Sequence, residues 1–598
     1  MNLLKQLRPV YLALGVVAAA LLAYGLWTSP QPQPADAEGF SSARVVEDIK
    51  VLSKEPHSVA PQHDSARIAV REYLITRLES LVSLDPIVRE DSLVADAVTI
   101  HPYDSLSGPD PKWKKHVAPY DFDAVNILAE FHPQEVTDST SYLMFVAHYD
   151  SRYEQPMPEG TVWSYGAADD GYGVGVTLET VKQLLKHKKD WKQGVKVLFT
   201  DAEEVGMEGM EAMWNDTTGR RVFDNVGLMI NLEARGPFGP CLLFETSPGN
   251  EKIMDLYSKA ADHKFTYSLT TVVYRFMPNF TDFTIVKDEI PGMNFSTIAD
   301  INHYHTDKDN FSNIDEESIQ HYGEQVLPVA LEYLTNPVYG DKNYLKSSDD
   351  TVNFTIPVLG FFNFTKTWYV IINVVLFLIF LGMFGLEGVR GRLKAKKVYK
   401  TSGMIFGMAV IAMLVGLLLT YLCCLISGAE FKFFGVIHGV QFDNIAMIVF
   451  MVLLALVLVF FYWKGRSKAV RSAHNSMRSS ASATAATHYA YNVLYGTLTL
   501  MFFLSAVLLL ALGENLMFMI PFAFAVIGLL LYKITSLKVW MLVAVFATLL
   551  HAFSFLYALS MALTIGAFGA VMLIAVIDLM MLIPMADLYM MPSRTRRN

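Results

Sequence analysis

YLMFVAHYDSRYEQPMPEGTVWSYGAADD, residues 142–170, joins a short apolar run to a polar tip and an acidic turn. The apolar run, residues 142–147, has the length and bounds of a buried parallel strand, and it ends at His148 and Asp150. Asp169 and Asp170 follow in a turn, after which the chain can continue as a helix. Open α/β sheets carry their chemistry at the carboxyl ends of such strands. The segment therefore predicts a strand, a functional loop and a helix, in that order.

Two later apolar runs, residues 195–200 and 227–232, also end in acidic residues. Imidazole and carboxylate groups at strand ends suit a divalent metal such as zinc, because they match it in charge and softness. Of two adjacent glutamates at such a turn, one can bind a metal and the other can move a proton. The candidate residues at the strand ends and in a later loop are His148, Asp169, Glu203, Glu204, Glu233 and His305.

Five motifs occur in a fixed order along the chain: H-x-D at 148–150, G-A-x-D-D at 166–170, E-E-x-G at 203–206, N-L-E at 231–233 and Y-H-T-x-x-D at 304–309. In this order they resemble the co-catalytic zinc aminopeptidases, a family that includes secreted bacterial aminopeptidases and glutamate carboxypeptidases. The resemblance covers roughly residues 45–335. Residues 231–234, 243–246 and 357–362 are similar, more narrowly, to its membrane-embedded branch, which includes the endoplasmic-reticulum metallopeptidase and the vacuolar membrane protease.

The resemblance implies two zinc ions per chain, each held by a histidine, a glutamate and a shared aspartate: His148, Glu233 and Asp169 for one ion, and His305, Glu204 and Asp169 for the other. It also implies that Glu203 is the general base for metal-held water and that Asp150 orients His148. Two cations about 3.5–4 Å apart can share a carboxylate and polarise a scissile carbonyl. His303 competes with His305 as a ligand by spacing, but His305 matches the family motif better.

Each candidate also has a structural explanation when it is taken alone. His148 suits a half-buried structural histidine, and the adjacent glutamates suit the first turn of a helix. Only the complete ordered set favours a catalytic site. Four further residues are candidates for substrate binding: Arg152, Arg235, Asp282 and Tyr304. For the two arginines we favour structural ion pairing over contact with a substrate carboxylate, which would indicate a carboxypeptidase. Asp282 resembles a pocket-lining position, and it equally suits a helix N-terminus.

Alternating strand and helix patterns between residues 42 and 334 predict an α/β domain with a mostly parallel sheet between helices. The expected helices are 42–52, 63–81, 250–261 and 316–334, and the further expected strands are 96–100, 123–130, 242–244 and 292–296. Residues 341–367 are expected to link this domain to a membrane part. The outer domain contains a single cysteine, Cys241, so no disulfide is available to it.

The chain is too long for one domain and, at 52% hydrophobic residues, too apolar for a purely soluble protein. Residues 10–27 form an apolar run of about 18 residues, enough to span a bilayer. A cleavable signal peptide is the alternative, but the run continues to Trp27, which favours an anchor. Seven more apolar segments follow residue 366, so eight spans are predicted. The expected parts are a cytoplasmic tip and anchor (1–28), an extracytoplasmic zinc peptidase domain (29–366) and a seven-span domain (367–598).

Basic residues crowd every second connection between the apolar segments, at residues 390–400, 464–478 and 533–538, and they occur again at residues 594–597, after the last segment. Because basic loops stay in the cytoplasm, both termini are expected inside and the 29–366 domain outside. Short connections and the lack of disulfides favour a bacterial plasma membrane, with a eukaryotic endomembrane and a lumenal domain as the alternative. Asp578 and His551 are ionisable groups within apolar spans. We expect them at different depths and favour a scaffold role for the spans over transport.

The sequence therefore predicts a membrane-anchored di-zinc exopeptidase that acts on peptides outside the cytoplasm, most simply an aminopeptidase. Two alternatives remain open. One is a single-zinc transferase similar to glutaminyl cyclase, and the other is a non-catalytic receptor or complex subunit on the same fold. The expected partners are peptide substrates and the lipid bilayer, and no nucleic acid is expected. Residue preference and oligomeric state are left open.

Overall fold

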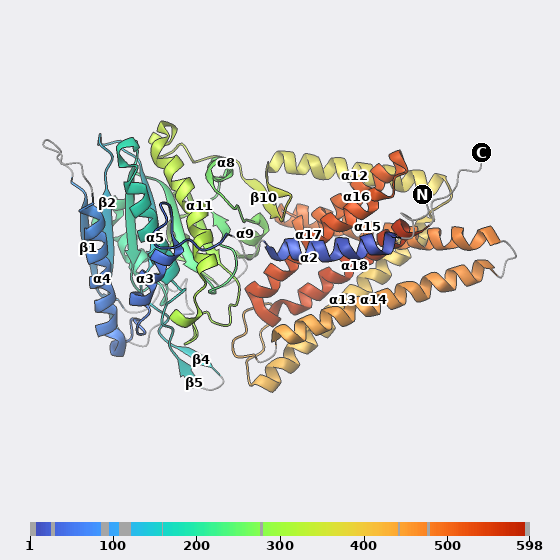
Figure 1. Ribbon diagram of the computed structural model, residues 1–598, viewed down its shortest axis with the longest axis horizontal. Coiled ribbons are helices and arrows are strands. Elements are labelled where there is room, and N and C mark those ends of the chain that lie inside the picture. Colours follow the sequence, from blue (N-terminus) through green and yellow to red (C-terminus); the bar gives the residue numbers. More distant parts are fainter. Residues whose placement is uncertain are drawn as a thin grey trace. The chain divides into compact units, whose positions relative to one another are not determined.

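A computed structural model gives the fold (Figure 1) and describes residues 7–25, 30–84, 95–106, 121–157, 160–274, 279–440, 443–474 and 479–591. Trp27, Arg478 and the arginines at 594–597 lie outside the described residues. The chain divides into two compact units. The α/β unit comprises residues 27–355 and 360–366, and the helical unit comprises residues 1–26, 356–359 and 367–598.

The α/β unit is built on a seven-stranded sheet with strand order β1-β2-β6-β3-β7-β9-β8. The four central strands, β6, β3, β7 and β9, pair in parallel, and all of their residues are buried, as continuous apolar runs require. The remaining pairings, at the two edges, are antiparallel. The predicted α/β fold is thus confirmed, with the parallel part confined to the centre. The strands are β1 (Ala97–Leu106), β2 (Phe122–Phe131), β3 (Tyr142–His148), β6 (Gly194–Thr200), β7 (Val226–Ala234), β8 (Leu242–Thr246) and β9 (Gly292–Thr297).

Strand register brings three polar strand ends to one edge of the sheet. His148 at the end of β3 pairs with Thr200 at the end of β6. On its other side β3 pairs with β7, with Val146 opposite Asn231, so His148 is level with Glu233. Side chains that follow these strands therefore start from the same edge, which is where parallel sheets place their sites.

Helices cover both faces of this sheet, and β3 supplies both faces with core residues in alternation. Leu143 and Phe145 pack with the larger core, which includes α3, α5 and α11, whereas Met144 and Val146 pack with a smaller core under α6 and α10. The helices of this unit are α3 (Ser42–Leu52), α4 (Asp64–Val82), α5 (Gly171–Leu185), α6 (Glu208–Asn215), α7 (Thr217–Arg220), α8 (Glu251–Ala260), α9 (Ser268–Tyr274), α10 (Asp282–Val286) and α11 (Glu316–Thr335).

Two short two-stranded sheets complete the unit. β4 (Gln155–Met157) and β5 (Gly160–Val162) pair between the first strand end and the acidic turn. β10 (Thr351–Ile356) and β11 (Gly360–Thr365) form the second small sheet. The segment 341–367, which was expected to link the two parts, therefore contains a pair of strands. Pro357 ends β10, and Val358 and Gly360 have φ values of 68° and 96°, which turn the chain back into β11.

The helical unit contains seven stretches long and apolar enough to cross a membrane, counted over the described residues. The chain is accordingly a multi-pass membrane protein. The difference from the predicted eight lies in the last stretch, Val539–Met590, which contains two helices that pack on each other. They are separated at Thr564, where φ is 50° and ψ is −150°. The helices are α2 (Arg8–Gly25), α12 (Lys366–Val389), α13 (Ala395–Ser427), α14 (Asp443–His474), α15 (Ser479–Leu512), α16 (Leu516–Thr535), α17 (Val539–Leu563) and α18 (Phe568–Met590).

Contacts inside the helical unit bear on the expected first span and on the expected depths of His551 and Asp578. Helix α2 packs along α17, so the first apolar run is part of the bundle. Helices α17 and α18 form a hairpin around residues 564–567. At 1.5 Å per residue, His551 lies about 20 Å before this turn and Asp578 about 17 Å after it. The two residues therefore lie at similar depths, contrary to our expectation from the apolar boundaries.

Candidate metal centre

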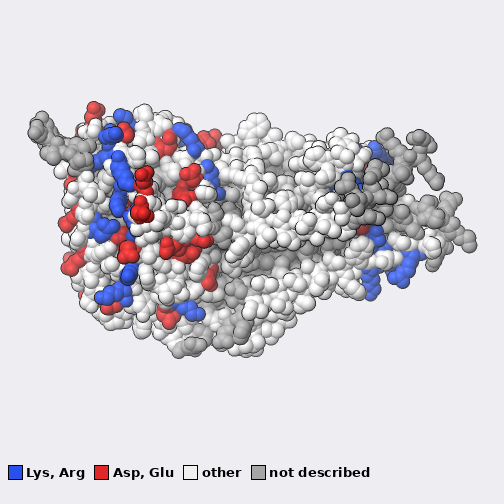
Figure 2. Space-filling model, viewed as in Figure 1, with Lys and Arg blue, Asp and Glu red and all other residues white. Residues whose placement is uncertain are grey.

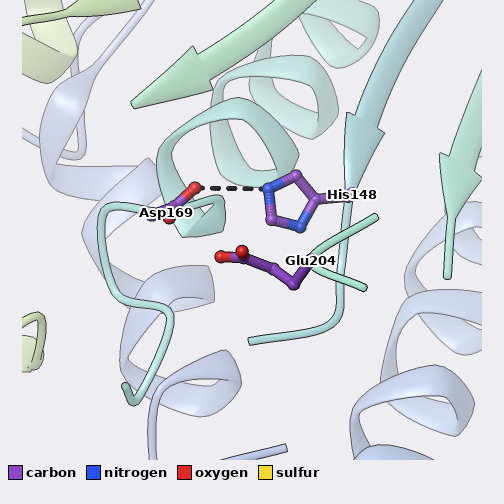
Figure 3. Close-up of side chains that lie close together, drawn as sticks. All are labelled: His148, Asp169 and Glu204. Carbon is purple, nitrogen blue, oxygen red and sulfur yellow. Dashed lines mark hydrogen bonds and ion pairs between the residues drawn. The ribbon is translucent and has the colours of Figure 1, made fainter. Parts of the chain in front are cut away.

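His148 reaches the centre from the end of β3 with its ring held in one orientation (Figure 3). Its Nδ1 lies 2.9 Å from the main-chain oxygen of Asp150. A carbonyl oxygen only accepts hydrogen bonds, so Nδ1 carries the proton and Nε2 presents a lone pair. Nε2 lies 3.2 Å from Asp169 Oδ1 and 3.8 Å from Glu233 Oε2. This is the tautomer that a metal ligand requires.

Asp169 is positioned by the turn that precedes α5. The main-chain N–H groups of Ala168 and Asp169 donate to the carboxylate of Asp309, over 2.7 and 3.4 Å. Asp170 caps α5 by accepting from the Gly173 N–H over 2.9 Å. The peptide bond between Asp169 and Asp170 is cis. These contacts leave the Asp169 carboxylate directed at the two histidines of the centre.

Glu203 and Glu204 follow β6 in a turn that Asp150 holds. The two carboxylate oxygens of Asp150 accept the main-chain N–H groups of Glu203 and Glu204, over 3.0 and 3.2 Å. Arg152 donates to the main-chain oxygen of Glu204 over 2.7 Å and lies 3.4 Å from its Oε2. Asp150 was expected to orient His148 through its carboxylate, but that contact measures 3.5 Å and the main-chain carbonyl makes the shorter bond.

His305 completes the other side of the centre. Its Nε2 lies 3.1 Å from Glu204 Oε2 and 3.3 Å from Asp169 Oδ2. The ring of Tyr304 stacks on the His305 ring with 3.6 Å between centroids. His303, the competing histidine, has its Nδ1 3.2 Å from Asp300 Oδ2. The structure thus directs His305, and not His303, at the carboxylates.

The contacts divide into two sets, one on each oxygen of Asp169. Oδ1 faces His148, whose Nε2 also faces Glu233, and Oδ2 faces His305, whose Nε2 also faces Glu204. Ligand atoms around a tetrahedral zinc ion with bonds of 2.0–2.1 Å lie about 3.3 Å apart. The separations of 3.1–3.8 Å fit that geometry.

Buried polar atoms that lack a hydrogen bond support the same conclusion. Asp169 Oδ2, Glu204 Oε1 and His305 Nε2 are buried and have no hydrogen-bond partner in the described part of the chain. Such atoms are costly unless an ion or a ligand satisfies them. Ligand atoms of His148, Asp169 and Glu204 all lie within 4.8 Å of one another. The residues therefore fit a metal centre.

The crowding of carboxylates shifts their proton affinities. Burial raises the pKa of Glu233 to about 8, and the charge of Asp169 adds to this rise. Burial also raises the pKa of Glu203 well above its usual range, with Glu233 and Asp282 contributing. For Glu204, burial alone would raise the pKa, but His305 and Arg152 lower it below the usual range. A site with so many carboxylates is stabilised by bound cations.

The remaining substrate-binding candidates fall in different surroundings. Arg152 contacts Glu204, as structural ion pairing predicts. Asp282 is buried at the start of α10, where its Oδ2 accepts from the Thr200 hydroxyl, and burial raises its pKa to about 6. The guanidinium of Arg235 lies 5.7 Å from the centre of the Tyr304 ring. Arg235 and Tyr304 thus lie together beside the centre.

Sequence reasoning missed two supports of the site. Asp309 holds the Asp169 turn, and its only sequence signal was its place in the fifth motif. Asp201 accepts from Arg67, from the Tyr149 hydroxyl and from the Val125 N–H. The buried Asp201 carboxylate therefore connects Tyr149, which lies between His148 and Asp150, to the turn before Glu203. Arg67 has no local signal, because 134 positions separate it from Asp201.

The fold and the site together define an α/β domain with a metal centre of histidines and carboxylates at the carboxyl edge of its sheet. Residues 126–330 match the sequence profile of Peptidase family M28. The chain is 31% identical over 214 residues to endoplasmic reticulum metallopeptidase 1 of Rattus norvegicus, which covers 35% of this chain and 22% of that protein. It is 24% identical over 341 residues to the vacuolar membrane protease of Candida tropicalis, covering 56% of this chain and 33% of that protein. The predicted resemblance is therefore confirmed.

The chain spans less than half the length of these curated relatives. Among solved structures, a zinc aminopeptidase from Bacillus subtilis is similar, with a TM-score of 0.35 and 13% identity over 51% of this chain and 98% of that one. Glutaminyl cyclase of Porphyromonas gingivalis is similar with a TM-score of 0.36 and 19% identity, over 50% of this chain and all of the other.

Proposed function

We propose that the protein is a membrane-anchored exopeptidase, an aminopeptidase, that uses two zinc ions per chain. The observation that carries this proposal is the division of contacts on Asp169. Each of its oxygens faces a different histidine, and each histidine faces a different glutamate. A single-zinc transferase would need only one of these sets. The donor types, imidazole nitrogen and carboxylate oxygen, match zinc.

Bound zinc supplies a Lewis acid for the scissile carbonyl and lowers the pKa of water. The chain itself supplies the proton transfer. The main-chain N–H of Glu203 is held by Asp150, and its half-buried carboxyl group lies close enough to Glu233 and Glu204 for their charges to raise its pKa. Its raised pKa suits a group that accepts a proton from the attacking water and then donates it to the leaving amine. Glu203 is therefore the proposed general base and acid.

Acidic side chains around the centre favour an unblocked amino terminus as the group that is bound. Glu233 and Asp282 are buried near Glu203, and Asp282 Oδ1 has no hydrogen-bond partner in the described residues. A protonated substrate amine would satisfy these acceptors. This is the reason for proposing an aminopeptidase instead of a carboxypeptidase.

We also propose that the peptidase part, residues 29–366, lies outside the cytoplasm of a bacterial cell, anchored in its plasma membrane by the spans in residues 1–28 and 367–598. The basic connections support this orientation. Lys and Arg gather at one end of the helical unit, while its middle shows neither basic nor acidic residues in the view of Figure 2. The α/β unit carries both charge signs over its surface, as a water-facing domain does.

The test combines turnover and zinc content on one detergent-solubilised sample. Glu203→Gln is expected to keep about two zinc ions and to lose about 100- to 10,000-fold in kcat on unblocked short peptides, because the amide cannot accept the proton. Glu316→Gln, at an exposed position on α11, is the matched control and should keep wild-type turnover.

Other outcomes would point to the alternatives. Equal hydrolysis of unblocked and N-acetylated peptides would rule out an aminopeptidase. A single zinc ion per chain with cyclisation of N-terminal glutamine would favour the transferase. Full zinc content without any turnover would favour a receptor or complex subunit.

A further inference from the structure

Three polar side chains lie side by side in the sheet next to the metal centre: Asn231 on β7, Asn294 on β9 and Glu245 on β8. Strand register pairs Asn294 with Asn231 on one side and with Glu245 on the other. Glu245 is 2% exposed, and both asparagines are 0% exposed. Buried polar groups are costly unless they bond to one another or to a ligand. We refer to these three residues as the polar strip.

The direction of each hydrogen bond in the polar strip is determined by the carboxylate at its outer end. Glu245 forms an ion pair with Lys287 over 2.5 Å, and as a carboxylate it only accepts hydrogen bonds. Asn294 must therefore turn its Nδ2 group to Glu245 Oε2, which lies 3.2 Å away. Asn294 Oδ1 then accepts from Asn231 Nδ2 over 3.0 Å. The same Nδ2 group donates to Glu233 Oε1 over 3.1 Å, so the polar strip ends on a candidate metal ligand.

The bond from Asn231 leaves one oxygen of Glu233 for a metal ion. Oε1 accepts from Asn231, whereas Oε2 is the oxygen that lies 3.8 Å from His148 Nε2. The last torsion of a glutamate side chain is broad and roughly twofold, so an unheld carboxylate can exchange its two oxygens. A donor that holds one oxygen orients the other, and such supports strengthen metal binding. The polar strip thus presents Glu233 Oε2 on the side of His148.

Helix α10 is fastened to the polar strip at both of its ends. Thr281, which caps the first turn of this helix, accepts from Asn294 Nδ2 over 3.0 Å. Lys287, which follows the last residue of the helix, pairs with Glu245. Asp282, proposed above to accept the substrate amine, is the first residue of α10. The polar strip therefore holds this helix as well as the metal ligand.

Two members of the polar strip belong to sequence segments that had no assigned role, 231–234 and 243–246. The structure joins these segments through Asn294, which is 63 positions from Asn231 and 49 from Glu245. No local pattern in the sequence connects the three residues. Their contact follows only from the neighbouring places of the three strands in the sheet.

We propose that the polar strip positions Glu233 as a ligand through Oε2, and that it thereby sets the affinity of the zinc ion that Glu233 shares with His148. Asn231 is the positioning residue, and the other two members of the strip act through it. The proposal rests on the two-zinc centre given above. The zinc ion proposed at His305 does not use Glu233, so the polar strip should act on one ion and spare the other.

The experiment measures zinc content per chain against buffered free zinc, on the full chain in detergent. Asn231→Leu keeps the approximate size of the side chain and removes the donor. The free zinc concentration needed to fill one of the two positions is expected to rise about 10- to 100-fold, as when a group that orients a metal ligand is lost. Asn231→Leu should therefore hold one ion over a range of free zinc in which the wild type holds two.

A double-mutant cycle distinguishes positioning from a general loss of stability. Glu245→Gln removes the charge that fixes the direction of the Asn294 amide, so we expect a smaller loss of affinity for the same zinc ion. In the Asn231→Leu background, Glu245→Gln should cause no further loss, because its influence passes through Asn231. An additive loss, or no loss in the wild-type background, would overturn the polar strip.

A matched control is Asn353→Leu, which removes another buried asparagine of the α/β unit. Asn353 lies on β10, where its Oδ1 accepts from Thr266 Oγ1 over 2.9 Å. This variant should melt at a lower temperature than the wild type and bind both zinc ions with wild-type affinity.

Two outcomes for Asn231→Leu would overturn the polar strip while the peptidase function stands. One is binding of both zinc ions with wild-type affinity, and the other is an equal loss of affinity for both ions. A wild type that binds fewer than two zinc ions, or that hydrolyses no peptide, would instead overturn the proposed function, and the polar strip with it.

Discussion

Asp169 is the residue on which the organisation of the centre depends. Its turn is held by Asp309 and by the capping contact of Asp170, so the carboxylate has little freedom to rotate. The two oxygens face His148 and His305 separately, and this geometry supports the proposed bridging role. Asp150, which supports the neighbouring residues, also has two separate roles. Asp150 orients His148 with its main-chain oxygen and uses its carboxylate for the turn of Glu203 and Glu204.

Replacing Asp169 by asparagine is expected to empty the centre. The amide has one oxygen and no negative charge, so it cannot neutralise and join two cations. We expect Asp169→Asn to retain fewer than about one zinc ion per chain and to lose at least about 100-fold in turnover. Metal analysis of the purified protein checks this, with Asp190→Asn, at an exposed position, as the control. Full zinc content in Asp169→Asn would contradict the bridging role.

Among the secondary-structure elements, α11 is tied to the segment before β8 by a buried histidine. His321 Nδ1 accepts the Cys241 N–H over 2.8 Å, and its Nε2 lies 2.7 Å from the main-chain oxygen of His263. Gln325, one turn later, donates to Cys241 O over 2.7 Å. Both ring nitrogens of His321 are thus used in its neutral form. A second proton on the ring would face the Cys241 N–H and break this contact.

The pH dependence of stability should reveal this helix contact. Burial lowers the pKa of His321 to about 4, against an ordinary value of 6.5. Below pH 6.5 the unfolded chain therefore binds a proton that the folded chain does not, so stability is lost as the pH falls from about 6.5 towards about 4. The full effect is about 3 kcal/mol.

We expect the apparent melting temperature of the α/β unit, measured in the full-length protein, to fall more steeply over this range in the wild type than in His321→Gln. The reason is that glutamine has no titrating ring. Parallel curves for the two proteins would show that His321 is not the group responsible.

At the scale of the whole molecule, a water-facing α/β unit and an apolar helical unit are combined in one chain. The helical unit has internal polar contacts of its own, such as the ion pair of Lys533 with the buried Glu387. Asp578 and His551 lie at similar depths in the α17–α18 hairpin, and the Asp578 Oδ1 atom has no hydrogen-bond partner in the described residues. A buried carboxyl group in a span is a candidate for function.

Orientation in the membrane can be tested with two matched cysteine substitutions. Lys396 and Lys432 are both exposed; Lys396 lies in the first turn of α13, and Lys432 lies in the connection that follows the other end of that helix. If basic connections face the cytoplasm, Lys432→Cys should react with a membrane-impermeant maleimide in intact cells, whereas Lys396→Cys should react only after permeabilisation. The native cysteines are Cys241, Cys423 and Cys424, and wild-type protein treated with the same maleimide provides the background. The reverse pattern would place the α/β unit in the cytoplasm.

The sequence alone determined which segments form the central strands and which side chains follow them. Helices 42–52 and 316–334 were predicted almost to the residue, because the spacing of apolar residues and the capping groups are local properties. Imidazole and carboxylate groups at strand ends likewise identified the candidate ligands, since donor chemistry is a property of the residue.

Only the tertiary structure decided how these groups are used. The assignment of each Asp169 oxygen, the two roles of Asp150, and the place of Arg235 over Tyr304 depend on contacts between residues far apart in the chain. The similar depth of His551 and Asp578 depends on where the last hairpin turns. Such features follow from packing, which fixes distances that no local pattern contains.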